Sequence, residues 1–272
     1  MKISTISKYI FLAFTLAFFN SCNDDDNDNA QDVTEAGTIS LNFSNVIGTS
    51  DLELDTDFTA ASGDEITFTR FQYIISNVTL IGEDGSTYLI PDSYYIFGQA
   101  SDTSALKEDI EIADIPAGSY TGIQFSIGVD PTTNANTDTY EKGDLQGGLG
   151  LDWGWATGYK FINWEGSYFN TSTNEDVDFR FHIGTDDNYR TFEQDFPQVI
   201  TINGEMTTDI MFEVQANDIF EAVGLNDLGV NLPATDATFT GVMFSPTDKA
   251  TLIADAYANM FTLHHVMNSS AE

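Results

Sequence analysis

Apolar and polar residues alternate along most of this chain, and this alternation is the feature that most constrains its fold. The segments 39–43, 123–129 and 177–183 place an apolar side chain at every second position. A period of two puts those side chains on one face of a β-strand. The chain is long enough for its apolar faces to form a sizeable core. The pattern therefore predicts an all-β fold, with a single β-sandwich-like domain over residues 37–272.

Two segments predict where the strands bend or turn. Between residues 66 and 81 the apolar positions change parity, which predicts a bulge or bend near Ser76-Asn77. The strand 200–202 ends at Asn203-Gly204, a dipeptide suited to a tight hairpin turn. We therefore expect residues 210–214 to form the return strand of a hairpin.

One segment has a helical period. Apolar residues recur at helical spacing from Ala250 to Phe261, after Pro246-Thr247-Asp248, which is a suitable helix start. This spacing predicts one amphipathic helix near the C-terminus, packed on the sheets.

The N-terminal leader predicts export and lipid attachment. Lys2 and Lys8 precede an apolar run that is too short to span a membrane, and the run ends at Ser21-Cys22. Residues 1–22 therefore look like a lipoprotein signal peptide in which Cys22 is lipidated. The alternative is an ordinary signal peptide with an incidental cysteine. Because Cys22 is the only cysteine, the chain has no thiol left for a disulfide or a catalytic nucleophile.

An acidic linker follows the leader, and the chain as a whole is strongly acidic. Residues 23–36 begin with seven Asn and Asp residues, so we expect a disordered spacer, or an export signal to the outer face of the outer membrane. The net charge of −34 becomes −36 once the leader, with two basic and no acidic residues, is removed. Such a field excludes nucleic acid as a partner and leaves the lipid anchor as the contact with the membrane. We expect a cell-envelope, outer-membrane lipoprotein, periplasmic or surface-exposed.

Histidine and methionine are the candidate metal ligands. His182 lies on the polar face of its strand, and Met211 lies on the polar face of another. His264 and His265 are adjacent, and adjacent residues of a regular strand point to opposite faces. A set of His and Met without thiolate suits copper, especially Cu(I), better than structural zinc. The alternative for His182 is an ordinary hydrogen-bonded strand residue.

An aromatic run and an Asn-rich loop support two other functions. Trp153, Trp155, Tyr159 and Phe161 share one parity, so on a strand they form one aromatic face. With Trp164, such rings can serve as a stacking platform in a glycan- or protein-binding module, although core packing is the commoner role. The second function is a calcium-stabilised structural surface protein, with oxygen donors from the loop beginning at Asp130. The donors considered are Asp130, Asn134, Asn136 and Asp138.

Catalytic motifs are missing from the sequence. It contains no Gly-x-Ser-x-Gly elbow, no His-Glu-x-x-His helix and no phosphate-binding glycine loop. Carboxylates are so numerous that no particular pair indicates a glycosidase. We expect a binding protein and not an enzyme.

Several of these segments together resemble the MbnP family of secreted, copper-associated proteins. The most specific are Trp153-Gly154-Trp155-x-x-Gly158-Tyr159 and Phe181-His182-Ile183-Gly184, in that order, followed by Asp255-Ala256-Tyr257-Ala258-Asn259-Met260-Phe261. The resemblance covers most of the chain from about Gly37 to Met267.

The resemblance implies an all-β extracytoplasmic domain, in which some members bind copper through histidine and a tryptophan oxidised to kynurenine. A partner diheme enzyme of the peroxidase type carries out that oxidation in the family, so the chain itself is a substrate and a binder. Carried over by motif, His182 is the ligand candidate and Trp153 or Trp155 the oxidation site. The chain has no second histidine near the Asp130 loop, so His264, His265 or Met211 is expected to complete the site.

Overall fold

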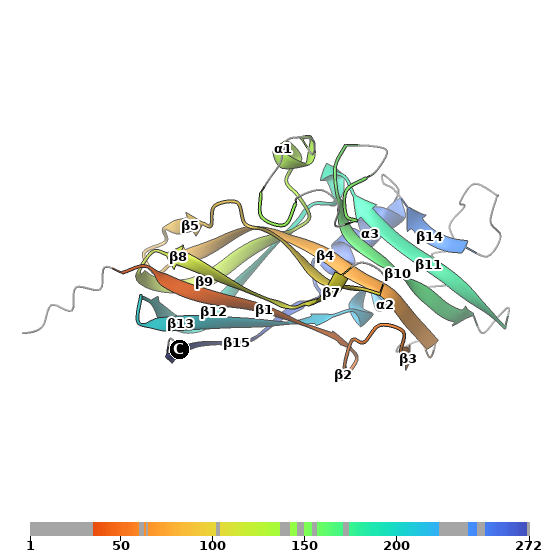
Figure 1. The fold of residues 1–272 in the computed structure, drawn as a ribbon, viewed down its shortest axis with the longest axis horizontal. Helices are drawn as coiled ribbons and strands as arrows, with labels where there is room; N and C mark the ends of the chain where they lie inside the picture. The colour runs from red at the N-terminus through yellow and green to blue at the C-terminus, as the bar shows by residue number, and fades with distance from the viewer. Residues whose placement is uncertain are drawn as a thin grey trace, which may run out of the picture. The chain divides into compact units, whose positions relative to one another are not determined.

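Two β-sheets face each other across a shared core in this protein, whose structure is a computed structural model (Figure 1). The structure describes residues 35–59, 63, 65–101, 104–136, 142–145, 150–153, 157–170, 174–222, 239–243 and 248–270. Cys22, residues 23–34 of the acidic linker, Asp138 and Trp155 lie outside these ranges.

The smaller sheet has five strands in the described residues and joins the two ends of the domain. Its central strand, β1, pairs in parallel with β13 and antiparallel with β8, while β15 pairs with the other edge of β13. The strands are β1 (Gly37–Ile47), β2 (Ser50–Asp51), β8 (Asp109–Ile115), β13 (Met206–Gln215) and β15 (Phe261–Ser270).

The larger sheet has ten strands in the described ranges and carries most of the motif residues. Its path runs β12-β9-β4-β10-β11-β14, with the shorter strands paired beside it. The strands are β3 (Asp57–Thr59), β4 (Glu65–Gly82), β5 (Thr87–Leu89), β6 (Tyr94–Ala100), β7 (Ser104–Lys107), β9 (Gly118–Ile127), β10 (Lys160–Asn170), β11 (Glu175–Gly184), β12 (Arg190–Ile202) and β14 (Phe239–Met243).

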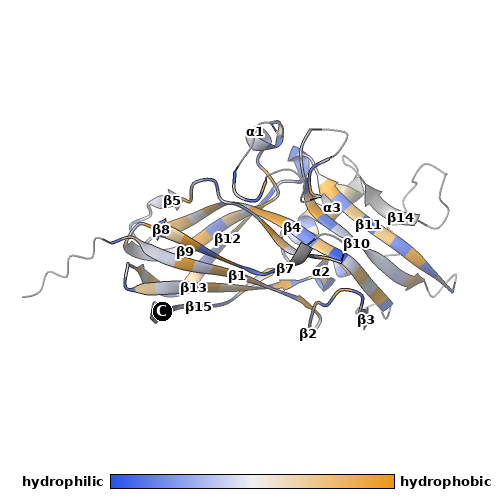
Figure 2. Cartoon of the chain, in the orientation of Figure 1, coloured by the Kyte–Doolittle hydropathy of each residue, from blue (hydrophilic) through white to orange (hydrophobic). Residues whose placement is uncertain are grey.

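The core between the sheets is rich in aromatic rings. Phe43 of β1 stacks on Phe212 of β13 at 5.6 Å and meets Phe125 of β9 edge-on at 5.5 Å. Figure 2 shows apolar and polar residues alternating along β10 and β11. Fully burying one such side chain contributes about 1.5–3 kcal/mol, so the alternation strongly selects which face turns inward. The predicted all-β, sandwich-like fold is confirmed.

The predicted change of face in the long strand is also confirmed. The pairing of β4 with β9 shifts register between Ser76 and Thr79, and Asn77 adopts a positive φ of 53°. Asparagine tolerates this left-handed conformation better than most residues. The bend allows both Ile75 and Val78 to be buried in the same core.

The predicted hairpin at Asn203-Gly204 is wrong. β12 pairs with β9 in the larger sheet, whereas β13 pairs with β1 and β15 in the smaller sheet. The chain therefore crosses from one sheet to the other at this turn. Gly204 is not among the residues with positive φ, which the expected hairpin turn requires.

The predicted C-terminal helix is confirmed as α3 (Asp248–Tyr257), which buries Ala250, Ile253, Ala254 and Tyr257 in the core. Shorter helical segments are α1 (Pro131–Asn134), η2 (Asp186–Asn188) and α2 (Asn217–Ala222). No helix in the described part of the chain has the length and apolar character needed to cross a membrane.

Gly98 provides a test of the pairing between β6 and β4. Its φ is +95°, and a Cβ placed there would lie 1.9 Å from the backbone oxygen of Phe71. We expect Gly98→Ala to lower the free energy of unfolding by about 3 kcal/mol or more. The control is Gly85→Ala, where φ is +81° but nothing lies within 4 Å, with an expected loss of about 1 kcal/mol. Urea unfolding of both variants measures this, and equal losses would contradict the close approach.

Candidate metal centre

The candidate site lies on the outer face of the larger sheet, where β4, β10 and β11 are neighbours. Trp164 pairs with Phe71 and Phe181, and all three side chains point into the core. The adjacent row, formed by Gln72, Asn163 and His182, therefore points to the opposite face. This parity is the reason why His182 is separated from the main core although it is only 9% exposed.

Glu165 holds the imidazole of His182. The Nε2 atom of His182 lies 2.7 Å from Oε1 of Glu165, which is two residues along β10 from its direct partner Asn163. Burial lowers the pKa of His182, and nearby Lys160 and Arg180 lower it further, while Glu165 opposes them. The hydrogen bond to His182 lowers the pKa of Glu165. The stable arrangement is a neutral imidazole that donates Nε2–H to a carboxylate, which leaves Nδ1 with a lone pair.

Trp153 covers the same end of β11. Its ring centroid lies 6.4 Å from that of His182, with the planes inclined by 62°. The indole packs against Gly184, where an added Cβ would lie 3.2 Å from Nε1 and Cζ2 of the ring. The ammonium of Lys160 lies 5.4 Å from the ring centroid and donates to the carbonyl of Gly150. His182 and Trp153, which is one of the two tryptophans named from the family motifs, are thus neighbours.

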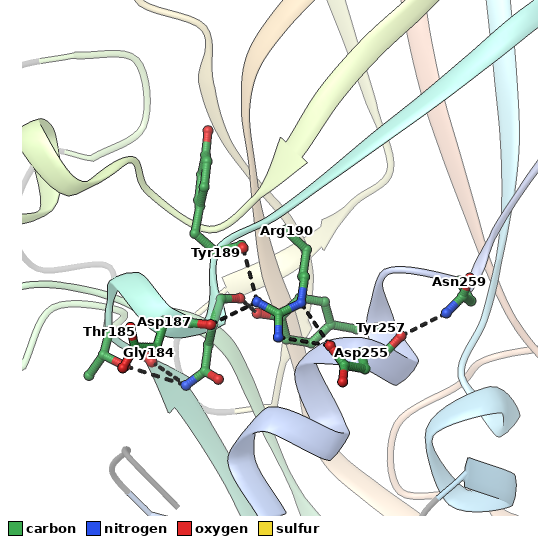
Figure 3. Close-up of polar contacts among 9 residues, drawn as sticks. Gly184, Thr185, Asp187, Tyr189, Arg190, Asp255, Tyr257 and Asn259 are labelled. Atoms are coloured by element: carbon green, nitrogen blue, oxygen red, sulfur yellow. Dashed lines mark hydrogen bonds and ion pairs between the residues drawn. The ribbon is translucent and has the colours of Figure 1, made fainter. Parts of the chain in front are cut away.

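The turn after Gly184 is held by a hydrogen-bond network with α3 (Figure 3). Thr185 has a φ of +72°, which residues other than glycine rarely adopt. Asn188 Nδ2 donates to the Gly184 carbonyl at 2.8 Å, and the hydroxyl of Tyr257 donates to the Asn188 carbonyl. The turn that supports Trp153 therefore depends on the C-terminal helix.

A second contact also joins this turn to α3. Arg190 donates from Nε and Nη2 to Asp255 Oδ1, at 3.0 and 2.8 Å, and from Nη1 to the Asp187 carbonyl. Asn259 Nδ2 donates to the backbone oxygen of Asp255 at 2.7 Å. The segment 255–260, which belongs to the sequence motifs, is thus a support for the site.

The other predicted ligands lie elsewhere. Met211, His264 and His265 belong to β13 and β15 of the smaller sheet and point away from the core, as His182 does from the larger sheet. The two groups are on opposite outer faces, so one ion cannot join His182 to Met211, His264 or His265. The prediction of a single combined site is therefore wrong.

A smaller correction concerns the backbone of the histidine pair. The strand is bulged at His264, so His264 and His265 point to the same outer face and not to opposite faces.

Among the described residues, Trp153 and Tyr159 do not share one strand, so they do not form the common strand face that the alternation predicted. Trp153 and Tyr159 lie on two antiparallel arms, since Trp153 N donates to the Gly158 carbonyl and Asp152 bridges to Tyr159. Trp153, Tyr159 and Trp164 are all buried, with Trp164 fully enclosed in the main core. These three rings do not form the exposed stacking platform that a glycan-binding module needs.

Two of the oxygen donors predicted for calcium, those of Asp130 and Asn134, already accept hydrogen bonds within the protein. Asp130 caps α1 through Oδ1 and accepts from the Tyr94 hydroxyl through Oδ2. Asn134 Oδ1 accepts from the backbone of Tyr159, and Asn136 Nδ2 donates to the Thr132 carbonyl. The described part of this loop thus has a structural role in holding the aromatic arm.

The described residues fit a metal with few protein ligands. No three side chains of His, Cys, Asp or Glu in these ranges form a complete metal shell. Beside His182, however, Asn163 Oδ1 is buried and has no hydrogen-bond partner in the described part of the chain. A carboxylate that orients a histidine from its other ring nitrogen is the usual outer support of a metal ligand. The sequence analysis did not assign this role to Glu165. The pairing of β10 with β11 places the side chain of Glu165 on the same outer face as that of His182.

The depressed pKa of His182 gives a test in metal-free protein. Below about pH 6.5 the unfolded chain binds a proton at this position that the folded protein does not bind. The free energy of unfolding should therefore fall, as the pH is lowered through this range, more for the wild type than for His182→Gln. Urea unfolding with a chelator at pH 7.5, 6.5 and 5.5 measures the difference, and a constant difference would show that His182 is not a buried neutral imidazole.

The support from α3 is tested with Tyr257→Phe. Removal of the hydroxyl leaves the buried Asn188 carbonyl without this donor, and we expect a loss of about 1–3 kcal/mol in unfolding free energy. Asp255→Asn is the control, because its pair with Arg190 is partly exposed and contributes about 1 kcal/mol or less. A loss for Tyr257→Phe no larger than for Asp255→Asn would contradict the assigned role of the hydroxyl.

Among the comparisons with known proteins, a family model identifies the family. A search of curated protein sequences found no match. The solved structure of MbnP from Methylosinus trichosporium is similar with a TM-score of 0.42 and 12% sequence identity, over 65% of this chain and 76% of that chain. The family model described as MbnP matches residues 36–239, which is well over half of the sequence. The chain belongs to the MbnP family.

Proposed function

We propose that this protein binds and handles copper in the cell envelope, without catalytic activity of its own. The observation that carries the proposal is the neutral, nearly buried His182, oriented by Glu165 and next to Trp153. A neutral imidazole is a good ligand for copper, and its second nitrogen is already engaged by a carboxylate. Family membership supports the same function.

We propose that Trp153, once oxidised, supplies the second copper ligand. An unmodified indole is only a hydrogen-bond donor, so it offers copper no good ligand. Kynurenine would supply an aromatic amine and a carbonyl at the same position. Conversion would consume two molecules of hydrogen peroxide, each of which transfers one oxygen atom to the indole and leaves as water. The C2–C3 bond is cleaved to give N-formylkynurenine, and hydrolysis then releases C2 as formate. A diheme peroxidase-type partner would provide this oxidation, as in the family to which the chain belongs.

The location is part of the proposal. The leader and Cys22 support a lipoprotein of the outer membrane, held by its lipid anchor, on either the periplasmic or the outer face. The net charge of −36 that remains after removal of the leader suits exposure to a saline medium.

The proposal is tested by Cu(I) titration against a competing chromophoric chelator under reducing conditions. His182→Gln retains a polar side chain that can donate to Glu165 but lacks the imidazole, so we expect the Cu(I) affinity to fall by at least about tenfold. Peptide mass mapping of protein from its native host reports the state of Trp153 and Trp155.

The matched control is Asp187→Asn, which alters one exposed acidic residue close to the same end of β11. Its affinity should equal that of the wild type. Equal losses in both variants would indicate nonspecific uptake by the acidic surface, and the copper proposal would then be abandoned.

A further inference from the structure

A β-bulge places two histidines side by side on the outer face of the smaller sheet. Met211 pairs with His265 and Phe212 pairs with Leu263, so His264 is the extra residue in β15. Leu263 and Val266, which flank the pair, both pack against the main core. Both imidazoles consequently project outward, with His264 exposed and His265 partly buried.

The two rings meet through the same nitrogen. Nδ1 of His264 lies 2.9 Å from Nδ1 of His265, a hydrogen-bond distance, so without a metal one of the two nitrogens carries a proton that an ion would displace. Metal–imidazole bonds of about 2.0–2.1 Å give this separation when the two nitrogens subtend an angle of roughly 90° at the ion. Right-angled nitrogen ligands are typical of the square-planar or tetragonal geometry of Cu(II), whereas a tetrahedral ion needs nitrogens farther apart.

Asp209 orients one of the rings. Asp209 lies on β13, the strand next to β15, and its Oδ2 is 3.2 Å from Nε2 of His265. A carboxylate at Nε2 favours the tautomer with the proton on that nitrogen, so that Nδ1 carries the lone pair. The same support holds His182 through Glu165, which makes Asp209 an outer partner here and not a ligand.

Soft donors lie on the same outer face. Met211 is the register partner of His265, and Met267 follows two positions later in β15 with 49% of its surface exposed. Among divalent first-row ions, copper binds nitrogen sites most tightly. The geometry points to a second metal site, for Cu(II), in which His264 and His265 bind through Nδ1 and solvent or a thioether completes the coordination.

This second site does not depend on the function proposed for His182. The two positions lie on opposite outer faces of the sandwich, separated by the full core. Substitution of His182 should therefore affect metal binding only at the first site, and substitution of His264 or His265 only at the second.

The test is Cu(II) titration of the full-length chain in detergent, with glycine as a weak competitor, followed by electron paramagnetic resonance. Wild-type protein should show superhyperfine coupling to two imidazole nitrogens. His264→Ala should lose one nitrogen coupling and weaken binding by at least about tenfold, and His265→Ala should do the same. Asp209→Asn keeps an acceptor oxygen, and we expect a smaller loss.

Two controls keep the result interpretable. Glu213→Gln removes one negative charge from the same strand and face as Asp209, and should leave Cu(II) binding unchanged. His182→Gln should also leave the two-nitrogen signal intact. His264 is exposed, so its replacement should preserve the melting temperature.

Three outcomes would overturn the assignment. They are wild-type Cu(II) binding in His264→Ala, equal losses in Glu213→Gln and the histidine variants, and loss of the two-nitrogen signal in His182→Gln.

Discussion

The alternation of side chains along β10 and β11 is the constraint on which the rest of the structure depends. Trp164 and Phe181 turn inward, and the ring of Trp164 stacks on Phe71 at 4.2 Å. Because the period is two, Glu165 and His182 must then turn outward on the same two strands. If β10 shifted its register by one residue, the carboxylate of Glu165 would take the buried place of the Trp164 indole. Burying that charge would be strongly unfavourable, so the core determines the register. The position of His182 follows from this requirement.

Charge is distributed unevenly around that histidine. The sequence has only nine Lys and Arg residues against forty-three acidic ones, yet Arg70, Lys160 and Arg180 all lie near His182 or Glu165. Lys160 and Arg180 disfavour a positive charge on the imidazole, in addition to the effect of burial. A strongly acidic protein thus keeps a local environment in which burial and two nearby cations favour the neutral form of one histidine.

Local patterns in the sequence predicted local structure well. The strands, the bend at Ser76-Asn77 and the helix α3 all follow from the spacing of apolar residues within one segment. The pairing between segments was harder to predict from the sequence, because the turn at Asn203-Gly204 can join two strands of one hairpin or two strands in different sheets. The bulge at His264 was missed for the same reason, because a bulge is defined by the partner strand. For the site, the motifs proposed His182 with Trp153 or Trp155, and the structure shows His182 beside Trp153, while Glu165 became visible only when the pairing of β10 with β11 was known.

The parallel pairing of β1 with β13 has a consequence for how the chain acquires its structure. Thr38 is the partner of Thr207, so about 170 residues separate the two sides of this pairing. The ribosome or an export channel releases the chain from its N-terminus onward. One edge of β1 therefore stays unpaired until β13 has emerged. The smaller sheet is therefore completed late, and its exposed edge is the place where a newly delivered chain is most open to pairing with another copy of itself.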